Sequence, residues 1–288
     1  MRVAFFGLGN MGFPIAANLL KHGHSVVTAV HRDPAPALRL QELGGIIADS
    51  PAQAVTGAEV IFTIVPEDTA LLNLLLDETL AAAVRPGSII VDMTSASPKA
   101  VQTVAEFYAP RGVEVLDAPV SGGVAGAKAG TMTMLCAGKE AVLAQLTPLL
   151  ECISGKRCYV GPRQGHGKII KSLNNLLNAV NKAAVGEAWR MAEAHGIDPD
   201  AFEEAVSASS GDSYAFRTTF PRMKKQDFTA AFALSLMRKD VGLAMALSDG
   251  QYLPLSETTL KYYQLAAEFD REDSSAVTKV WFPAPEAD

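Results

Sequence analysis

The first half of the chain alternates short apolar runs with longer stretches of helical periodicity. The apolar runs lie at 2–6, 25–30, 60–65, 88–93, 113–118 and 132–137, and helix-length stretches lie at 11–22, 34–43, 67–83 and 98–109. The runs are apolar throughout instead of alternating with polar residues, which is typical of strands covered on both faces. This order of elements predicts an α/β fold with a Rossmann-type, doubly wound parallel sheet.

The pattern changes at the glycine-rich segment GPRQGHG, residues 161–167, beyond which only helical periodicity is found. Helices are expected at 166–195, 199–208, 213–225, 233–248 and 256–270. We therefore predict two domains, a Rossmann domain at 1–162 and an all-α domain at 163–288 that is led by one long interdomain helix.

Composition narrows the class of protein. Of the 288 residues, 49% are hydrophobic, which allows a large core, and the net charge of −6 provides no basic patch for nucleic acid. Three cysteines without a CxxC pair indicate free thiols in a reducing compartment, and five scattered histidines provide no metal site. No run approaches the roughly 18 apolar residues of a membrane span, and glycines interrupt the apolar N-terminus. We therefore expect a cytoplasmic enzyme that binds no metal, nucleic acid or membrane.

The segment GLGNMG, residues 7–12, joins the first predicted strand to the first predicted helix. In a dinucleotide fingerprint the first glycine permits a tight turn, the second lets the backbone approach the pyrophosphate, and the third lets helix and strand pack closely. The helix N-terminus adds N–H groups and a positive dipole end. A turn that merely tolerates glycine is the alternative. We expect a dinucleotide to bind at Gly7, Leu8, Gly9, Asn10, Met11 and Gly12.

The end of the second predicted strand bears on the choice of cofactor, because it reads Val30-His31-Arg32-Asp33. An NAD-specific enzyme usually places an acid there to bind the ribose 2′-hydroxyl, but His31 takes that position and Arg32 follows it. An arginine fork suits a phosphate, so we expect His31 and Arg32 to bind cofactor and NADP to be preferred. NAD stays possible, since Asp33 reaches the ribose if the strand ends one residue later.

A second glycine-rich segment, DAPVSGGVAGAKAGTMTM at 117–134, follows the strand predicted at 113–118. Doubly wound sheets bind ligands beyond the carboxyl ends of their strands, and successive small residues expose N–H groups that can hold an anion. We expect Ser121, Gly122 and Gly123 to bind a substrate carboxylate. A long flexible connection is the alternative.

The segment GHGKIIKSLNN, residues 165–175, opens the long helix. At 100° per residue one stripe of this helix is apolar, with Ile169, Leu173, Leu176 and Val180. The opposite stripe is polar, with Lys171, Asn175, Asn178 and Lys182, which is typical of a solvated face. The composition favours another interpretation, because each asparagine costs a helix about 0.5 kcal/mol or more relative to alanine. A packed polar surface is expected instead, with Lys171 and Asn175 side by side at i and i+4.

The chain resembles the β-hydroxyacid dehydrogenase family, which includes 3-hydroxyisobutyrate dehydrogenases, tartronate semialdehyde reductases and glyoxylate/succinic semialdehyde reductases. Four motifs occur in the family's order over nearly the whole chain: GLGNMGFPIAANL (7–19), DAPVSGGVAGAKAGTM (117–132), GHGKIIKSLNN (165–175) and KDVGLA (239–244). The resemblance implies hydride transfer between NADP(H) or NAD(H) and a small β-hydroxy acid or semialdehyde that carries a carboxylate. It also implies a homodimer or homotetramer, with the all-α domain serving substrate binding and dimerisation.

The resemblance implies roles for individual residues. Lys171 is the expected general acid or base, Asn175 helps to hold the lysine and the substrate, and Ser121, Gly122 and Gly123 bind the substrate carboxylate. The cofactor is expected to contact Val65, Pro66, Ser95 and Lys239. The substrate pocket is expected to be closed by Phe232 and Asp240. Lys168 has no such role and is interpreted as part of the solvated face.

Two departures and three rival functions stay open, and one of the rivals, a 6-phosphogluconate dehydrogenase, would normally need a longer helical domain. The segment His31-Arg32-Asp33 does not match the family's usual strand end, and SSGDSYAFRTTFP at 209–221 lies where family members differ according to substrate. Imine reductases resemble this scaffold but commonly replace the lysine that Lys171 matches. A non-catalytic dinucleotide-binding protein is the third alternative, although it has no need of Lys171, Asn175 and the Ser121 segment together.

Overall fold

The computed structural model describes residues 1–282, which divide into two compact units, the first ending at Lys171 and the second beginning at Ser172. The boundary lies inside helix α9 (His166–Ala194), whereas the sequence predicts it after residue 162. The difference arises because the first turn of α9 packs against the first unit. A Cβ on Gly167 would lie 2.5 Å from the carbonyl oxygen of Leu135.

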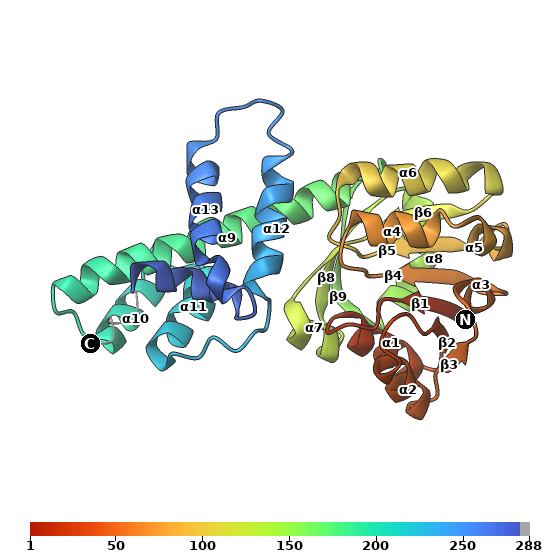
Figure 1. Ribbon diagram of the computed structural model, residues 1–288, viewed down its shortest axis with the longest axis horizontal. Helices are drawn as coiled ribbons and strands as arrows, with labels where there is room; N and C mark the ends of the chain where they lie inside the picture. Colours follow the sequence, from red (N-terminus) through yellow and green to blue (C-terminus); the bar gives the residue numbers. More distant parts are fainter. Residues whose placement is uncertain (283–288) are drawn as a thin grey trace. The chain divides into compact units, whose positions relative to one another are not determined.

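The first unit is built on a nine-stranded sheet (Figure 1). Its strands are β1 (Arg2–Phe6), β2 (Ser25–Ala29), β3 (Ile46–Ala48), β4 (Val60–Thr63), β5 (Ile89–Asp92), β6 (Glu114–Asp117), β7 (Val120–Ser121), β8 (Met132–Ala137) and β9 (Ser154–Gly161). They lie in the order β3-β2-β1-β4-β5-β6-β8-β7, and β9 pairs with β8. Strands β1 to β6 are parallel, whereas β8 is antiparallel to β6 and β7. This order confirms the predicted Rossmann-type sheet.

Helices connect these strands. They are α1 (Gly12–Lys21), α2 (Ala35–Glu42), α3 (Pro51–Val55), α4 (Asp68–Leu75), α5 (Glu78–Ala83), α6 (Pro98–Tyr108), η1 (Ala109–Arg111), α7 (Gly123–Ala129) and α8 (Glu140–Leu150). The single helix predicted at 67–83 is two helices, because Asp77 caps the start of α5 by accepting the N–H of Leu80 at 2.8 Å.

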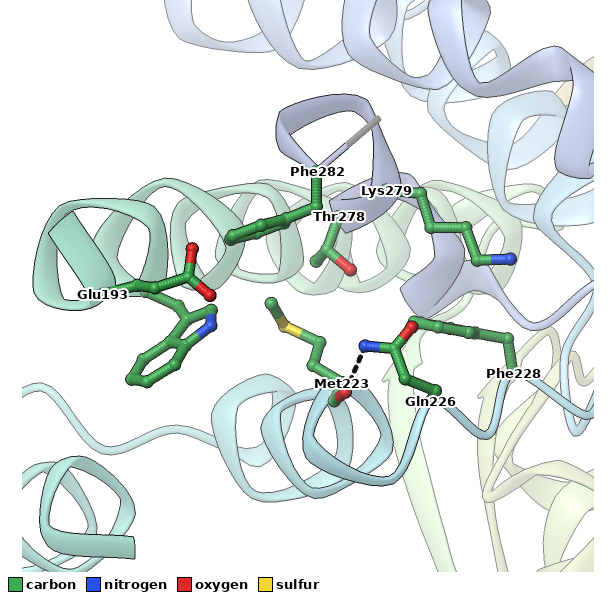
Figure 2. A pocket seen from close by; sticks show the side chains of 8 residues that line it. Glu193, Met223, Gln226, Phe228, Thr278, Lys279 and Phe282 are labelled. Carbon is green, nitrogen blue, oxygen red and sulfur yellow. Dashed lines mark hydrogen bonds between the residues drawn. The ribbon is translucent and has the colours of Figure 1, made fainter. Parts of the chain in front are cut away.

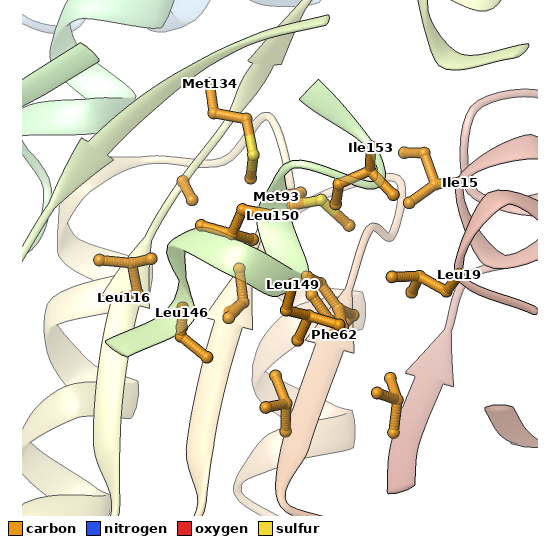
Figure 3. Packing of buried hydrophobic residues seen from close by; sticks show 14 of the residues in the cluster. Ile15, Leu19, Phe62, Met93, Leu116, Met134, Leu146, Leu149, Leu150 and Ile153 are labelled. Carbon is orange, nitrogen blue, oxygen red and sulfur yellow. The ribbon is translucent and has the colours of Figure 1, made fainter. Parts of the chain in front are cut away.

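Two apolar cores cover the two faces of the sheet. Val3 and Phe5 of β1 pack in one core with α1 and α8, whereas Ala4 and Phe6 pack in the other with α3 to α6. Figure 3 shows the first core, in which leucines of α8 pack with residues of several strands. Successive strand residues point to opposite faces, so a sheet buried on both faces needs strands that are apolar throughout.

The second unit consists of helices in the part of it that the structure describes. They are the remainder of α9 with α10 (Pro199–Ser207), α11 (Tyr214–Lys225), α12 (Leu234–Met245), α13 (Pro254–Leu265), η2 (Ala266–Phe269) and η3 (Ser274–Trp281). An isolated bridge joins Ala233 to Asp273. Aromatic rings fill part of the core, where the ring centroids of Phe216 and Phe220 are 5.4 Å apart. These elements confirm the predicted all-α domain.

No helix within residues 1–282 is both long enough and apolar enough to cross a membrane.

Candidate functional site

The GLGNMG segment connects β1 to α1 at the carboxyl end of β1, where the order of the strands reverses. Gly7 has a φ of +99°, and a Cβ there would lie 2.0 Å from the carbonyl oxygen of Ile64. A Cβ on Gly12 would lie 1.8 Å from the carbonyl oxygen of Gly7, whereas a Cβ on Gly9 would meet no atom within 4 Å. Packing therefore requires Gly7 and Gly12, while Gly9 borders open space of the kind that a pyrophosphate uses.

The other residues of this segment differ in exposure. Leu8 and Met11 pack against the first core and so hold the loop in place, whereas Asn10 is exposed. The geometry fits the cradle of a dinucleotide phosphate.

The residues that follow β2 are exposed. His31 and Arg32 have their side chains at the surface, and Asp33 accepts the N–H of Ala35 at 2.9 Å, at the start of α2. The carboxylate of Asp33 is therefore occupied in part by the local turn, which leaves His31 and Arg32 as the side chains available beside it.

The loops after β4 and β5, which carry Val65, Pro66 and Ser95, are fastened to each other. The N–H of Val65 donates to the hydroxyl of Thr94 at 3.2 Å. Asp68 accepts the N–H of Ser97 at 2.8 Å and also accepts the Ser97 hydroxyl. The structure thus brings the Val65–Pro66 and Ser95 loops together at the carboxyl edge of the sheet.

The segment after β6 is ordered as a short strand and a short helix. Val120 and Ser121 form β7 and pair with Met134 and Thr133 of β8, and α7 follows. Gly122 and Gly123 have φ values of +131° and +62°, so the sharp turn between β7 and α7 requires glycine. Asn18 of α1 donates to the carbonyl of Ala127 at 2.8 Å, which joins this segment to the helix that follows the fingerprint. The long flexible connection considered as an alternative is not what the structure has.

Lys168, interpreted from the sequence as part of a solvated face, is 1% exposed, so that interpretation is wrong. Its Nζ lies 2.9 Å from Asp92 Oδ2 and 3.1 Å from Asp117 Oδ1, and it donates to the Asp92 carbonyl at 3.0 Å. The two aspartates end β5 and β6, against which the first turn of α9 packs. An aspartate that directly follows buried apolar strand residues is the sequence signal that points to such a partner.

The charges of this cluster influence one another. Burial alone would lower the pKa of Lys168, but the two carboxylates more than offset burial and raise this pKa above its ordinary value. Burial raises the pKa of Asp117, although the neighbouring Lys168 acts to lower it. Lys168 therefore stays a cation at neutral pH, held between two buried acidic side chains.

Further along α9, the polar stripe is packed and the apolar stripe is partly exposed. Asn175 is 4% and Lys182 is 6% exposed, whereas Leu173 is 41% exposed. The Asn175 amide donates to Asp240 Oδ2 at 2.5 Å, and Lys239 Nζ lies 3.4 Å from Asp240 Oδ1. The packed polar surface expected from the asparagines is therefore found at Asn175 and Asn178, whereas Asn174 and Asn181 are exposed. The structure brings Asn175, Lys239 and Asp240 together, and half-buried Lys171 precedes Asn175 by one turn of α9.

Phe232 lies on a segment that a second buried ion pair holds in place. Asp273 accepts the N–H groups of Ala231 and Phe232, both at 3.1 Å, and Lys182 Nζ lies 3.7 Å from its carboxylate. Although burial alone would raise it, Lys182 and the N–H donors hold the pKa of Asp273 below its ordinary value. Burial lowers the pKa of Lys182, and the attraction of Asp273 does not fully offset this. No motif in the sequence pointed to this ion pair.

Replacing Asp273 by asparagine should lower the free energy of unfolding by about 3 kcal/mol at pH 7, because it leaves Lys182 buried without its carboxylate. A carboxyl group whose pKa is lowered on folding stabilises the folded state above its unfolded pKa of about 3.9, and this stabilisation is lost as the pH falls through the folded pKa. Urea unfolding across the pH range should show a constant gap from wild type at neutral pH that narrows only below about pH 4.

The matched control for this prediction is Asp249→Asn at an exposed position. An equal, small effect of both substitutions would contradict the proposed stabilisation by Asp273.

A small cavity of about 100 Å³ lies elsewhere in the second unit (Figure 2). Its lining residues are Trp189, Glu193, Met223, Gln226, Phe228, Thr278, Lys279 and Phe282. None of them is among the predicted site residues, so the cavity has no link to the predicted chemistry. Within residues 1–282 no group of three or more His, Cys, Asp or Glu side chains is placed to hold a metal ion.

Comparisons with known proteins bear on both units. Residues 2–161 match the family model described as the NAD binding domain of 6-phosphogluconate dehydrogenase. Residues 165–281 match the model described as NAD-binding of NADP-dependent 3-hydroxyisobutyrate dehydrogenase. A 3-hydroxyisobutyrate dehydrogenase of Pseudomonas aeruginosa is 35% identical, over 97% of this chain and 98% of that protein.

Solved structures give the same picture. The Mycobacterium tuberculosis 3-hydroxyisobutyrate dehydrogenase with L-serine is 32% identical with a TM-score of 0.91, over 98% of this chain and 99% of that chain. Psf3 in complex with NADP+ and 2-OPP is 25% identical with a TM-score of 0.87, over 96% of this chain and 99% of that chain. An imine reductase of Myxococcus stipitatus is 18% identical with a TM-score of 0.67, over 96% of this chain and 98% of that chain, and shares the fold alone.

Proposed function

Because this chain belongs to the β-hydroxyacid dehydrogenase family and is an oxidoreductase with NAD(P)-binding domains, we propose that it interconverts a small β-hydroxy acid and its semialdehyde. The proposed substrate carries a carboxylate. The observation that supports the proposed reaction most directly is the hydrogen bond from Asn175 of α9 to Asp240 of α12, which fixes the Asn175 amide one turn after Lys171.

The dinucleotide accepts or supplies the hydride when it is bound. In this proposal, the backbone of residues 7–12 holds its pyrophosphate, with Gly9 allowing the close approach that open space around its Cβ position permits. The loops that carry Val65, Pro66 and Ser95 border the ribose and nicotinamide. Lys239 is proposed as a further cofactor contact.

The substrate is proposed to be held at its carboxylate and to react at its hydroxyl-bearing carbon. Ser121 and the N–H groups of Gly122 and Gly123 bind the carboxylate, since a sharp turn of small residues can present several donors to an anion. Lys171 Nζ takes the proton from the substrate hydroxyl oxygen during oxidation and returns it to the carbonyl oxygen during reduction. Asn175 helps to hold Lys171 and the substrate, and Phe232 and Asp240 close the pocket.

NADP is the proposed preferred cofactor. The support is local: Arg32 and His31 are exposed just beyond β2, while the Asp33 carboxylate accepts a hydrogen bond from Ala35. A guanidinium suits the 2′-phosphate, whereas an NAD-specific site uses an acid at this point.

The experiment that tests this function supplies the purified protein with NADPH or NADH and a panel of semialdehydes. Glyoxylate and the succinic, tartronate and methylmalonate semialdehydes form the panel, and loss of reduced-nicotinamide absorbance is followed. We expect turnover of at least one compound, with a kcat/KM about tenfold or more higher for NADPH, which corresponds to at least one charged hydrogen bond to the 2′-phosphate.

Each other outcome points to a different function. A cyclic imine is supplied as an additional compound, and its turnover without turnover of the panel would indicate an imine reductase. Binding of dinucleotide without turnover of any of these compounds would indicate a non-catalytic protein. Faster turnover with NADH would overturn the role of Arg32.

A further inference from the structure

The Lys168 cluster is not explained by the proposed chemistry, because its ammonium is enclosed and too deeply buried to meet a substrate. Both carboxylates and the lysine side chain are 0% exposed. Burying a charge costs free energy that only close partners offset, so stability alone does not explain why three charged side chains are buried here.

The cluster joins four chain segments at one point. The Lys168 ammonium contacts three oxygens, namely one carboxylate oxygen of Asp92, one of Asp117 and the Asp92 carbonyl. The remaining oxygen of Asp92 accepts the hydroxyl of Thr63 at 2.8 Å and the N–H of Thr94 at 3.1 Å. The ends of β4, β5 and β6 are thus joined to the first turn of α9.

Asp117 also fixes the start of α9 through the backbone. Its second carboxylate oxygen accepts the N–H of Gly165 at 2.8 Å and that of Lys168 at 3.3 Å. A Cβ on Gly167 would lie 2.9 Å from the Asp117 carboxylate, so the helix approaches the strand as closely as glycine allows. The axial and rotational position of the first turn of α9 is therefore set by Asp117.

Each anchored point lies a few residues before a residue of the proposed site. Ser95 follows Asp92, Ser121 follows Asp117, and Lys171 follows Lys168 by three residues on the same helix. We propose that Lys168 is a positioning residue. It holds three segments in fixed positions relative to one another: the loop after β5 with Ser95, the segment after β6 with Ser121, and the first turn of α9, which leads to Lys171. The inference rests on the proposed function, since it concerns the residues to which that function assigns the chemistry.

The test compares wild type with Lys168→Met, which keeps the length of the side chain and removes the charge, and with the exposed control Lys156→Met. A small displacement of reacting groups can cost up to about 100-fold in rate, so we expect kcat of the folded Lys168→Met protein to fall by about 10- to 100-fold. We expect the KM for the dinucleotide to change by much less. The control should behave as wild type.

Two further measurements separate positioning from mere loss of stability. With a dinucleotide deuterated at the transferred hydrogen, the isotope effect on kcat should rise in Lys168→Met, because hydride transfer becomes slower than the other steps. Unfolding of a fraction of the molecules would lower the rate without changing the isotope effect. Hydrogen exchange of folded Lys168→Met should quicken selectively in residues 93–97, 118–123 and 166–171.

A triple variant keeps the proposal testable if Lys168→Met alone does not fold. Asp92→Asn/Asp117→Asn/Lys168→Met leaves no unpaired buried charge, and we expect it to fold and to show the same loss of kcat and the same selective exchange. A folded variant with a wild-type kcat and no selective exchange would overturn the positioning role. If wild type turns over no compound of the panel, the proposed function fails, and hydrogen exchange alone still decides whether Lys168 fixes the three segments.

Discussion

Replacing Lys171 by methionine should lower kcat for the proposed reaction by about 100-fold or more, the range that a lost general acid or base commonly costs. Methionine has nearly the length of lysine but cannot take or give a proton. Because Lys171 belongs to the proton-transfer step in this proposal, the dissociation constant of the dinucleotide should change little. Initial rates with the best semialdehyde and calorimetric titration with NADPH measure the two quantities.

The Lys156→Met protein again serves as the control for loss of an exposed lysine. Equal rates in wild type and Lys171→Met would contradict the role of Lys171 and return this part of α9 to a purely structural interpretation. A parallel loss of dinucleotide affinity would indicate that Lys171 holds the cofactor instead.

Replacing Gly9 by valine should weaken dinucleotide binding by about 100-fold, equivalent to about 2.7 kcal/mol, while leaving the protein folded. The backbone around Gly9 leaves the Cβ position open, so the protein itself accommodates the side chain. The added methyl groups would occupy the space through which the pyrophosphate approaches the backbone. Calorimetric titration with NADPH gives the affinity, and thermal unfolding gives the stability.

Two other glycine substitutions sharpen this prediction. Gly12→Ala should lower the melting temperature, because its Cβ would lie 1.8 Å from a carbonyl oxygen, whereas Gly211→Ala should leave dinucleotide affinity unchanged. A Gly9→Val protein that binds NADPH as wild type does would remove Gly9 from the proposed cofactor site.

Apolar periodicity was sufficient to predict the Rossmann sheet, because its central strands are buried on both faces. The same criterion does not reveal β9 (Ser154–Gly161), whose residues are mostly polar or half-exposed, or the short β3 and β7. Those strands form through pairing with neighbours distant in the sequence, which a local pattern does not record.

In the candidate site, too, features set by the local sequence were predicted better than features that depend on residues distant in the sequence. Glycine spacing predicted the turn at residues 7–12, although part of the steric requirement comes from Ile64, which follows β4. Periodicity placed Lys168 on a solvated face. The pattern along one helix does not show that Asp92 and Asp117, on other elements, pair with this lysine. Asparagine content gave the better guide at Asn175, since poor helix formers are retained where their amides have a partner.

The position of the unit boundary inside α9 has a consequence for modularity. A chain cut at the glycine-rich segment near residue 162 would lack the first turn of α9, on which the sheet of the first unit depends. A fragment ending there would leave the Asp92 and Asp117 carboxylates buried without their cation. Recombination between relatives that preserves a stable sheet must therefore carry the first turns of α9 along with it. Residues 163–171 therefore belong structurally to the first unit, although their periodicity assigns them to the helical one.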